Sequence, residues 1–283
     1  MQIELKNVNF IYNKDSAEQV EALSDINLTF GGDSFIAIIG STGSGKSTLI
    51  QLLNALQKPT EGTILWDGED IYALQDSKKR IRLLRCSVGM AFQYPEHQFF
   101  ETEVLKDVSF GPKNQGHTKE ESEELAKKAL AAVGLGPEYY EKSPFELSGG
   151  ELRRAGIAGI LAMEPEILIL DEPTAGLDPQ GKTDILDELK SIQQSRHITV
   201  ILVSHSMEEV ASYADRVIVL SSGHVIMDGS THEVFSRYKE LEEVGLKAPE
   251  VTYFMEELAQ AGIPVNANAI TIDEALKQII PLI

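Results

Sequence analysis

The residues best suited to chemistry form one continuous stretch, Gly40, Ser41, Thr42, Gly43, Ser44, Gly45, Lys46, Ser47 and Thr48. The spacing matches G-x-x-x-x-G-K-[ST], the pattern of a phosphate-binding loop. Its glycines allow backbone N–H groups to converge on phosphate oxygens with no Cβ in the way. Lys46 can reach the β- and γ-phosphates of a nucleotide, and the Ser47 hydroxyl is placed to bind Mg²⁺. The stretch therefore predicts binding of a nucleoside triphosphate with magnesium.

A pair of carboxylates, Asp171 and Glu172, directly follows the apolar run 167–170. Such a run predicts a central parallel strand, and ligands of α/β sheets bind at the carboxyl ends of the strands. There Asp171 can hold Mg²⁺ directly or through water, and Glu172 can orient and deprotonate the water that attacks a γ-phosphate. The alternative is that the two acids only cap the next helix. The phosphate-binding loop earlier in the chain favours the catalytic interpretation.

Other polar and aromatic side chains stand where expected strands end. Gln93 follows the run 87–92 and could contact Mg²⁺ or the attacking water. His205 follows the run 199–203 and could hold that water or donate to a γ-phosphate. Tyr12 follows the first expected strand and could stack on a nucleobase. Taken singly, each has an ordinary alternative, as a loop amide, a structural histidine or a packing aromatic.

A second candidate anion site lies at Ser148, Gly149 and Gly150, just before a helix expected over 152–163. A serine hydroxyl and unshielded N–H groups at the start of a helix can hold a phosphate with help from the helix dipole. If the segment stood alone, it would be interpreted as an ordinary helix N-cap followed by flexible glycines.

The periodicity of apolar residues predicts the elements that must position these side chains. Strands are expected at 2–10, 26–30, 34–39, 62–68 with its turn, 87–92, 167–170, 199–203, 217–220 and 224–227. The first of them should carry a bulge near Asn7. The apolar strand 34–39 before the phosphate-binding loop and the helix 48–56 after it argue against a chance match of a Gly/Ser linker. The predicted class is α/β, with an antiparallel β layer flanking that loop in the sequence.

The chain divides into a large and a small part. Residues 1–230 would form an α/β domain with a helical insertion over about 94–163, where no strand pattern is found. Residues 231–283 would form a small, mostly helical appendage that either packs on the core or pairs with another subunit. A capping box is expected in this appendage at Thr271 and Glu274.

The composition limits the classes of function. The chain has 283 residues and a formal net charge of −19, which argues against wrapping nucleic acid. The short basic run 78–80 is expected to be a solvated helix face. The single cysteine, Cys86, excludes an internal disulfide. No apolar run approaches the ~18 residues of a membrane span and no signal peptide is evident, so we expect a soluble, cytoplasmic protein.

In combination, these motifs resemble an ATP-binding cassette ATPase over roughly the first 230 residues. The residues that carry the resemblance are, in order, Tyr12, the phosphate-binding loop, Gln93, Ser148 to Gly150, Asp171, Glu172, Asp178 and His205. It implies a RecA-like nucleotide-binding core with an antiparallel β subdomain and an α-helical subdomain, and ATP and Mg²⁺ as ligands. It also implies a head-to-tail dimer, in which Ser148 and Gly149 of one subunit cap the ATP bound by the other.

The same resemblance implies a role for individual residues. Tyr12 would stack on adenine and Gln93 would sense the nucleotide, while Asp178 would communicate across the dimer. His205 would steady the γ-phosphate. In one position the chain departs from the family, because the signature usually ends in Gln and here ends in Glu151. A carboxylate facing a triphosphate is repelled, so the site that uses this signature should be slower or should hold Glu151 turned away.

A narrower resemblance lies in the segments 92–100, 110–112 and 158–165, which are similar to ATPase subunits of energy-coupling factor transporters. The last of these segments and the appendage are similar to the second of the two paired ATPases. This resemblance implies uptake of vitamins or other micronutrients at the cytoplasmic face of the membrane. The implied partners are a sister ATPase, an integral-membrane coupling protein and interchangeable substrate-binding membrane subunits. The aromatic loop after Gln93 would lie near the groove that receives a helix of the coupling protein, and the appendage would help dimerisation.

Several alternatives stay open. A homodimer could replace the heterodimer, and related nickel and cobalt importers share many of these motifs. Soluble cassette ATPases of DNA repair or chromosome organisation carry coiled-coil or zinc-binding insertions and basic surfaces, which this sequence lacks. Cassette proteins of translation normally hold two cassettes, whereas this chain has a single phosphate-binding loop. A binding module without catalysis would not need both Glu172 and His205.

Overall fold

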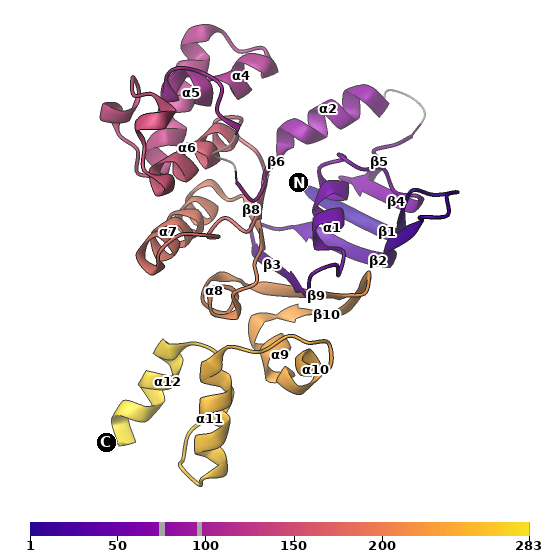
Figure 1. Ribbon diagram of the computed structural model, residues 1–283, viewed down its shortest axis with the longest axis vertical. Coiled ribbons are helices and arrows are strands. Elements are labelled where there is room, and N and C mark those ends of the chain that lie inside the picture. Colours follow the sequence, from indigo (N-terminus) through magenta and orange to yellow (C-terminus); the bar gives the residue numbers. More distant parts are fainter. Residues whose placement is uncertain (74–76, 95–97, 283) are drawn as a thin grey trace.

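The computed structural model describes residues 1–73, 77–94 and 98–282. A six-stranded sheet in the order β10-β9-β3-β8-β7-β6 runs through the middle of the molecule (Figure 1). Its strands are β3 (Phe35–Gly40), β6 (Val88–Ala91), β7 (Ile167–Asp171), β8 (Thr199–Val203), β9 (Arg216–Ser221) and β10 (His224–Ser230). Neighbouring strands are parallel, except that β10 forms an antiparallel hairpin with β9. Every residue of β3 and β8 is buried, which explains why both strands have uninterrupted apolar sequences.

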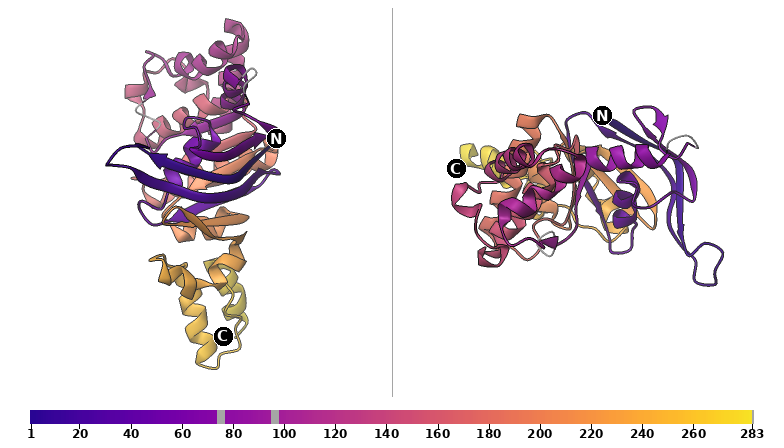
Figure 2. Two further views of the ribbon diagram at one scale, coloured as in Figure 1. Left: turned by 90° about the vertical axis from the view of Figure 1, so that its right-hand side faces the viewer. Right: turned by 90° about the horizontal axis from the view of Figure 1, so that it is seen from above.

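A second, antiparallel sheet has the order β2-β1-β4-β5, and its strands cross in front of the first sheet in the left view of Figure 2. Its strands are β1 (Gln2–Tyr12), β2 (Val20–Gly31), β4 (Glu61–Trp66) and β5 (Glu69–Asp70). The predicted bulge is confirmed, because the pairing of β1 with β2 shifts register between Leu5 and Val8. Asn7, within that shift, has a φ of 49°. The α/β class and the antiparallel layer predicted from sequence are both present.

Helix α1 (Lys46–Leu53) packs against both sheets, because its Leu49 and Ile50 share one buried cluster with apolar residues of β1, β2 and β3. The sequence predicts a helix as far as residue 56, and this prediction is wrong by three residues. The side-chain amide of the buried Asn54 donates to the Val88 carbonyl of β6, and Ala55 takes a φ of 53°. A contact with a distant strand therefore ends the helix.

Helices cover the other face of the main sheet, at the upper left of Figure 1. They are α3 (Val104–Val108), α4 (Phe110–Gln115), α5 (Lys119–Ala132), α6 (Gly149–Leu161) and α7 (Pro179–Arg196), with 3-10 turns at Pro137–Tyr139 and Pro144–Glu146. Small residues such as Ala129 and Ala158 let these helices pack closely on Leu168 and Leu170 of β7. Helix α2 (Ser77–Ser87) precedes β6, and α8 (Met207–Tyr213) follows β8.

The C-terminal helices extend away from both sheets, at the bottom of Figure 1. They are α9 (Thr231–Ser236), α10 (Tyr238–Glu243), α11 (Glu250–Gln260) and α12 (Ile272–Ile279), with a last 3-10 turn at Ile280–Leu282. Phe235 and Leu241 are fully buried and share a cluster with Val217 and Val219 of β9. This part of the appendage therefore packs on the core. The division of the chain near residue 230 stays a prediction.

Helices α9 and α10 are separated at Arg237, whose φ and ψ are −92° and 35°. One local prediction for the appendage needs correction. The capping box at Thr271 and Glu274 is only half formed, because the Glu274 carboxylate accepts the N–H of Ile270. None of the helices in the described ranges combines the length and the apolar character that crossing a bilayer requires.

Candidate nucleotide-binding site

The predicted phosphate-binding loop connects β3 to α1 and needs glycine at specific positions. Gly43 and Gly45 have φ values of 80° and 105°, in the region that favours glycine. A Cβ on Gly45 would lie 2.6 Å from the Ala22 carbonyl oxygen, whereas the space around Gly43 is open. The loop is therefore pressed against β2 on one side and exposed on the other. Ser41, Thr42, Gly43 and Ser47 all lie on that exposed side.

Two polar groups of this loop are buried. A phosphate could replace the present hydrogen-bond partners of one, Lys46, and supply a partner to the other, Ser44. Lys46 is 7% exposed, and its Nζ donates to the carbonyl oxygens of Gly40 at 2.7 Å and Ser41 at 3.0 Å. Burial lowers the pKa of Lys46, partly offset by the negative charges of Glu172 and Asp171. Among the described residues, the buried Ser44 Oγ has no hydrogen-bond partner. A buried cation and an unsatisfied hydroxyl in an open cradle fit a phosphate ligand.

Tyr12 reaches this loop from the end of β1. Its hydroxyl lies 3.1 Å from the Thr48 Oγ1, and its ring meets that of Phe10 edge to face at 4.7 Å. The side chain is therefore positioned beside the phosphate-binding loop and held by contacts within the protein. Stacking on adenine stays a prediction.

Three predicted catalytic side chains meet at one point. The Nε2 of His205 lies 2.9 Å from the Glu172 Oε1, and the Nε2 of Gln93 donates to the Glu172 Oε2 at 3.3 Å. Glu172 has a φ of 51°, and its N–H donates to the Val203 carbonyl at 2.9 Å. Because this hydrogen bond joins the ends of β7 and β8, it holds Glu172 between the two other side chains.

Asp171 stands at the end of β7, next to Glu172 in the sequence. Burial raises the pKa of Asp171, and the negative charge of Glu172 raises it further, while Lys46 and His205 oppose both effects. The described residues contain no cluster of three or more His, Cys, Asp or Glu side chains able to hold a metal. One carboxylate, of Asp171, and one hydroxyl, of Ser47, fit Mg²⁺, which usually takes one or two protein ligands together with phosphate oxygens and water. Ser47 and Asp171 are the residues that would hold it, with Gln93 as a further candidate.

The second candidate anion site begins α6. Ser148 is its N-cap, and its Oγ accepts the N–H of Glu151, while the Glu151 carboxylate accepts the N–H of Ser148 at 2.7 Å. Hydrogen bonds from the side chain and the backbone of Ser148, and from the Tyr139 hydroxyl, lower the pKa of Glu151 to about 2. The carboxylate is therefore turned toward the cap of its own helix. Ser148 and Gly149 are exposed.

The two anion sites of the chain are separate. In Figure 1, α6 and α1 lie on opposite sides of the strands β6 and β8. Ser148, Gly149 and Gly150 therefore do not contribute to the phosphate site of their own chain. Asp178 is likewise exposed, and it caps α7 by accepting the N–H of Gly181 at 3.0 Å.

Sequence reasoning missed two buried charges next to these loops. Arg153 of α6 is 3% exposed, and its guanidinium donates to the carbonyls of Pro173 at 2.9 Å and Ala175 at 2.6 Å. It also lies 5.8 Å from the ring centre of Tyr94. Glu209 of α8 is the second buried charge. Arg153 follows the signature segment directly, but nothing in a single sequence indicates which carbonyls it contacts.

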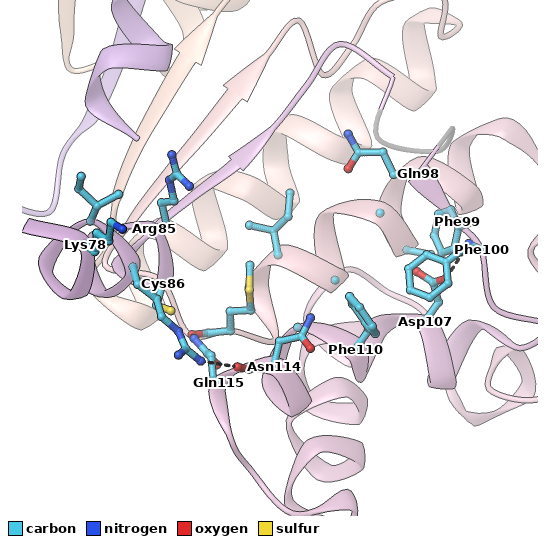
Figure 3. Close-up of a pocket in the computed structure, with 18 residues that line it drawn as sticks. Lys78, Arg85, Cys86, Gln98, Phe99, Phe100, Asp107, Phe110, Asn114 and Gln115 are labelled. Carbon is cyan, nitrogen blue, oxygen red and sulfur yellow. Dashed lines mark hydrogen bonds between the residues drawn. The ribbon is translucent and has the colours of Figure 1, made fainter. Parts of the chain in front are cut away.

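A groove of about 550 Å³ lies between α2 and the helices α3, α4 and α6 (Figure 3). Basic side chains of α2 line one wall, and the aromatic residues Phe99, Phe100 and Phe110 lie opposite. Phe100 is 61% exposed and meets Phe110 edge to face at 4.8 Å, whereas Phe99 packs on the core. Lys78 and Lys79 are exposed on α2, as predicted for a solvated helix face, and Lys78 also lines the groove. Residues 95–97 of the predicted aromatic loop lie outside the described residues.

Comparison with known proteins relates the chain to transport ATPases. A family model described as "ABC transporter" matches residues 23–175. The chain is 48% identical over 280 residues to the energy-coupling factor transporter ATP-binding protein EcfA2 of Caldanaerobacter subterraneus. The matched region covers 99% of this chain and 97% of that protein. The chain is also 48% identical to EcfA2 of Clostridium tetani over 100% of this chain and 97% of that protein.

Solved structures show the same similarity. CbiO1 of Clostridium perfringens, described as part of the ABC transporter complex cbiONQ, has a TM-score of 0.75 and 38% identity, covering 90% of this chain and 98% of that one. The ATP-binding cassette MJ0796, solved as a dimer bound to ADP and phosphate, has a TM-score of 0.71 and 30% identity over 81% of this chain and 98% of that one. The fold of the chain is thus that of an ATP-binding cassette.

We expect Asp171→Asn to stabilise the chain when nucleotide and metal are absent. The raised pKa of Asp171 means that its carboxyl destabilises the fold once it is ionised. This contribution is favourable below the unfolded-state pKa of about 3.9 and is lost as the pH rises through the raised folded value. The melting temperature of the variant should therefore exceed that of the wild type by a few degrees at neutral pH, and the difference should shrink toward acid pH.

Thermal melts across this pH range check the prediction. Asp178→Asn is the matched control, because asparagine also caps helices and Asp178 is exposed. Equal melting temperatures for wild type and Asp171→Asn at neutral pH would contradict the electrostatic account.

Proposed function

Because the chain belongs to the ABC transporter family, and within it to the EcfA2-type ATP-binding proteins of energy-coupling factor transporters, we propose that it hydrolyses ATP to power micronutrient uptake. The substrate class is vitamins or other micronutrients. The observation that carries the proposal is the meeting of Glu172, His205 and Gln93 at the edge of the main sheet. The charges of Glu172 and Lys46 act on each other there, so the acid lies close to the phosphate-binding loop.

We propose the following division of labour. The loop Gly40–Thr48 holds the triphosphate, and Lys46 exchanges its two backbone carbonyl partners for phosphate oxygens. Mg²⁺, when bound, supplies positive charge that offsets the charge of the triphosphate. Glu172 orients the attacking water and accepts its proton, and His205 restricts the carboxylate to one orientation and donates to the γ-phosphate. Tyr12 contributes stacking to the nucleobase.

A second cassette subunit would complete the site. The signature residues Ser148, Gly149 and Gly150 begin α6, which lies across β6 and β8 from α1 in Figure 1. Ser148 and Gly149 are exposed at this helix N-terminus, which is suited to anions. We propose a head-to-tail dimer in which they cap the ATP of the partner, with Asp178 near the interface. We favour a heterodimer with a sister ATPase and keep a homodimer as the alternative.

The groove in Figure 3 is the proposed contact with the membrane complex. One wall of the groove is aromatic and the other carries basic side chains of α2, and the exposed Phe100 is suited to contact a helix of an integral-membrane coupling protein. The groove residues 98–100 and Gln93 belong to one connection after β6, so occupancy of the groove and the catalytic amide can influence each other. The chain would then be a peripheral protein on the cytoplasmic face, with substrate-binding membrane subunits as further partners.

A second candidate function is the ATPase of a nickel or cobalt importer. Such importers share many of the motifs described above, and CbiO1 of an ABC transporter complex is 38% identical over 90% of this chain. The higher identity to EcfA2 proteins, 48% over nearly the full length, favours the energy-coupling factor transporter. Both candidates use the same hydrolytic residues.

We expect Glu172→Gln to keep ATP binding and to lose hydrolysis. The amide can accept hydrogen bonds but cannot take a proton, so kcat should fall by about 10²- to 10⁴-fold while the Kd for ATP changes little. Glu208→Gln, an exposed change on α8, is the control and should hydrolyse ATP normally. Turnover at the wild-type rate in Glu172→Gln would rule out this residue as the base.

The Glu151 carboxylate holds the Ser148 side chain, and we expect Glu151→Gln to release it. A charged acceptor binds a hydroxyl about 1 kcal/mol more strongly than a neutral one. The dimer site that uses this signature should therefore bind ATP up to about fivefold more tightly. Glu146→Gln is a matched control, because Glu146 closes the same type of cap on Ser143 one turn earlier. Equal ATP affinities for wild type and Glu151→Gln would show that the Glu151 carboxylate does not compete with ATP for the Ser148 side chain.

The partner assignment is tested by purifying the tagged chain from gently solubilised native membranes and identifying co-purified proteins by mass spectrometry. We expect a second cassette ATPase and a small coupling membrane protein, with substrate-binding subunits that indicate the cargo. Recovery with a permease and an extracellular binding protein would overturn the energy-coupling factor assignment and leave the ATPase chemistry intact.

A further inference from the structure

Glu209 is a buried carboxylate that the proposed mechanism does not use. It lies on α8, is 9% exposed and is the only acid among the buried polar and charged side chains of the described residues. An ionised carboxylate in such a place is costly unless its oxygens are hydrogen-bonded. Its partners therefore show what the residue does in the fold.

The local sequence predicts that the Glu209 side chain bonds the N-cap of its own helix, whereas in the structure it turns inward. Ser206 is the N-cap of α8 and Glu209 is its third residue, which is the pattern of a capping box. Four other pairs of this pattern close on their own N-caps, namely Thr118 and Glu121, Ser143 and Glu146, Ser148 and Glu151, and Ser230 and Glu233. In α8 the N–H of Ser206 instead donates to the Ser204 Oγ at 3.0 Å, and the Glu209 carboxylate turns inward.

The inward carboxylate joins the two loops that carry the catalytic residues. The Thr174 Oγ1 and the Ser204 Oγ donate to the same Glu209 Oε2 at 2.9 and 3.0 Å. Thr174 stands two residues after Glu172, and Ser204 directly precedes His205. One oxygen atom therefore links the loop after β7 to the loop after β8.

The other carboxylate oxygen reaches a third element. The Glu209 Oε1 lies 3.6 Å from the Nζ of Lys182 on α7, the helix that Asp178 caps. Glu209 is thus connected to the loop of the catalytic acid, the loop of the histidine and the helix that begins at the proposed dimer interface.

We propose that Glu209 is a positioning residue for hydrolysis, which holds the Glu172 and His205 loops at a fixed separation. The 2.9 Å contact between Glu172 and His205 would then depend on the two hydroxyl bonds behind it as well as on the two side chains. Loss of those bonds would let the loops move apart, and a misplacement of about 1 Å can lower a rate about a hundredfold. This inference rests on the proposed ATPase function.

The first test removes the hydroxyl donors and leaves the acid in place. Thr174→Val and Ser204→Ala each delete one hydrogen bond to Glu209. They are made singly and together, in the full chain within its ATPase complex. We expect the double variant to lower kcat about ten- to a hundredfold with less than about a twofold change in KM. Ser122→Ala is the control, because it removes a buried hydroxyl of α5 that bonds only the Thr118 carbonyl in the described structure.

The second test separates positioning from simple stabilisation. Glu209→Gln should lower kcat in the wild-type background but have little further effect in His205→Ala, because the contact that it positions is already lost there. A purely structural role would lower the melting temperature of both backgrounds and leave kcat per folded complex unchanged. If Glu209→Gln fails to fold, the Thr174 and Ser204 variants are combined with His205→Ala instead.

The outcomes distinguish this inference from the proposed function. If the wild-type complex hydrolyses no ATP in the same preparation, the function proposal fails and the inference fails with it. If Glu172→Gln is inactive but the Thr174, Ser204 and Glu209 variants keep their kcat, only the inference is overturned. A fall in kcat that is additive with His205→Ala also overturns it.

Discussion

The structure depends on one constraint, that parallel strands place all their carboxyl ends at the same edge of a sheet. Strands β3, β8, β7 and β6 are paired in parallel, so the residues that follow them are brought together although they are far apart in the chain. The phosphate-binding loop follows β3, Glu172 follows β7, His205 follows β8 and Gln93 follows β6. Helices pack on both faces of these apolar strands and fix them in place. The polar groups at the strand ends are therefore held at fixed positions.

This edge concentrates charge, which has an energetic cost. Lys46 and Asp171 both have pKa values displaced by burial, each in the direction that disfavours its charged form. The displacement is expected of a site whose charges are balanced by a ligand as well as by one another. Glu172 adopts a left-handed backbone conformation, held by a hydrogen bond to β8, so local strain is also accepted at this point. Stability is lower here than packing alone would allow, as is common where a fold carries function.

A second constraint separates the two anion-binding segments. The signature serine begins a helix in the helical layer, while the loop of Lys46 begins a helix that packs between the sheets. The two helix ends lie apart within one chain, which is why we propose that a second subunit completes the chemistry of each end. Arg153 connects the two regions, because it starts in the signature helix and binds the carbonyls of Pro173 and Ala175 next to Glu172. Changes at the signature therefore have a direct route to the catalytic loop.

The sequence by itself determined the parts that depend on short-range patterns. Apolar runs predicted the strands, and the order of the motifs predicted the cassette fold and most of the candidate site. Tertiary structure alone decided which groups touch, as with the Glu172 and His205 contact, the end of α1 at Leu53 and the groove beside α2. Glu209 shows the reason. Its local pattern predicts a capping box, but its carboxylate instead accepts the hydroxyls of Ser204, five residues earlier, and of Thr174, 35 residues earlier. The contact with Thr174 is set by packing rather than by neighbouring residues.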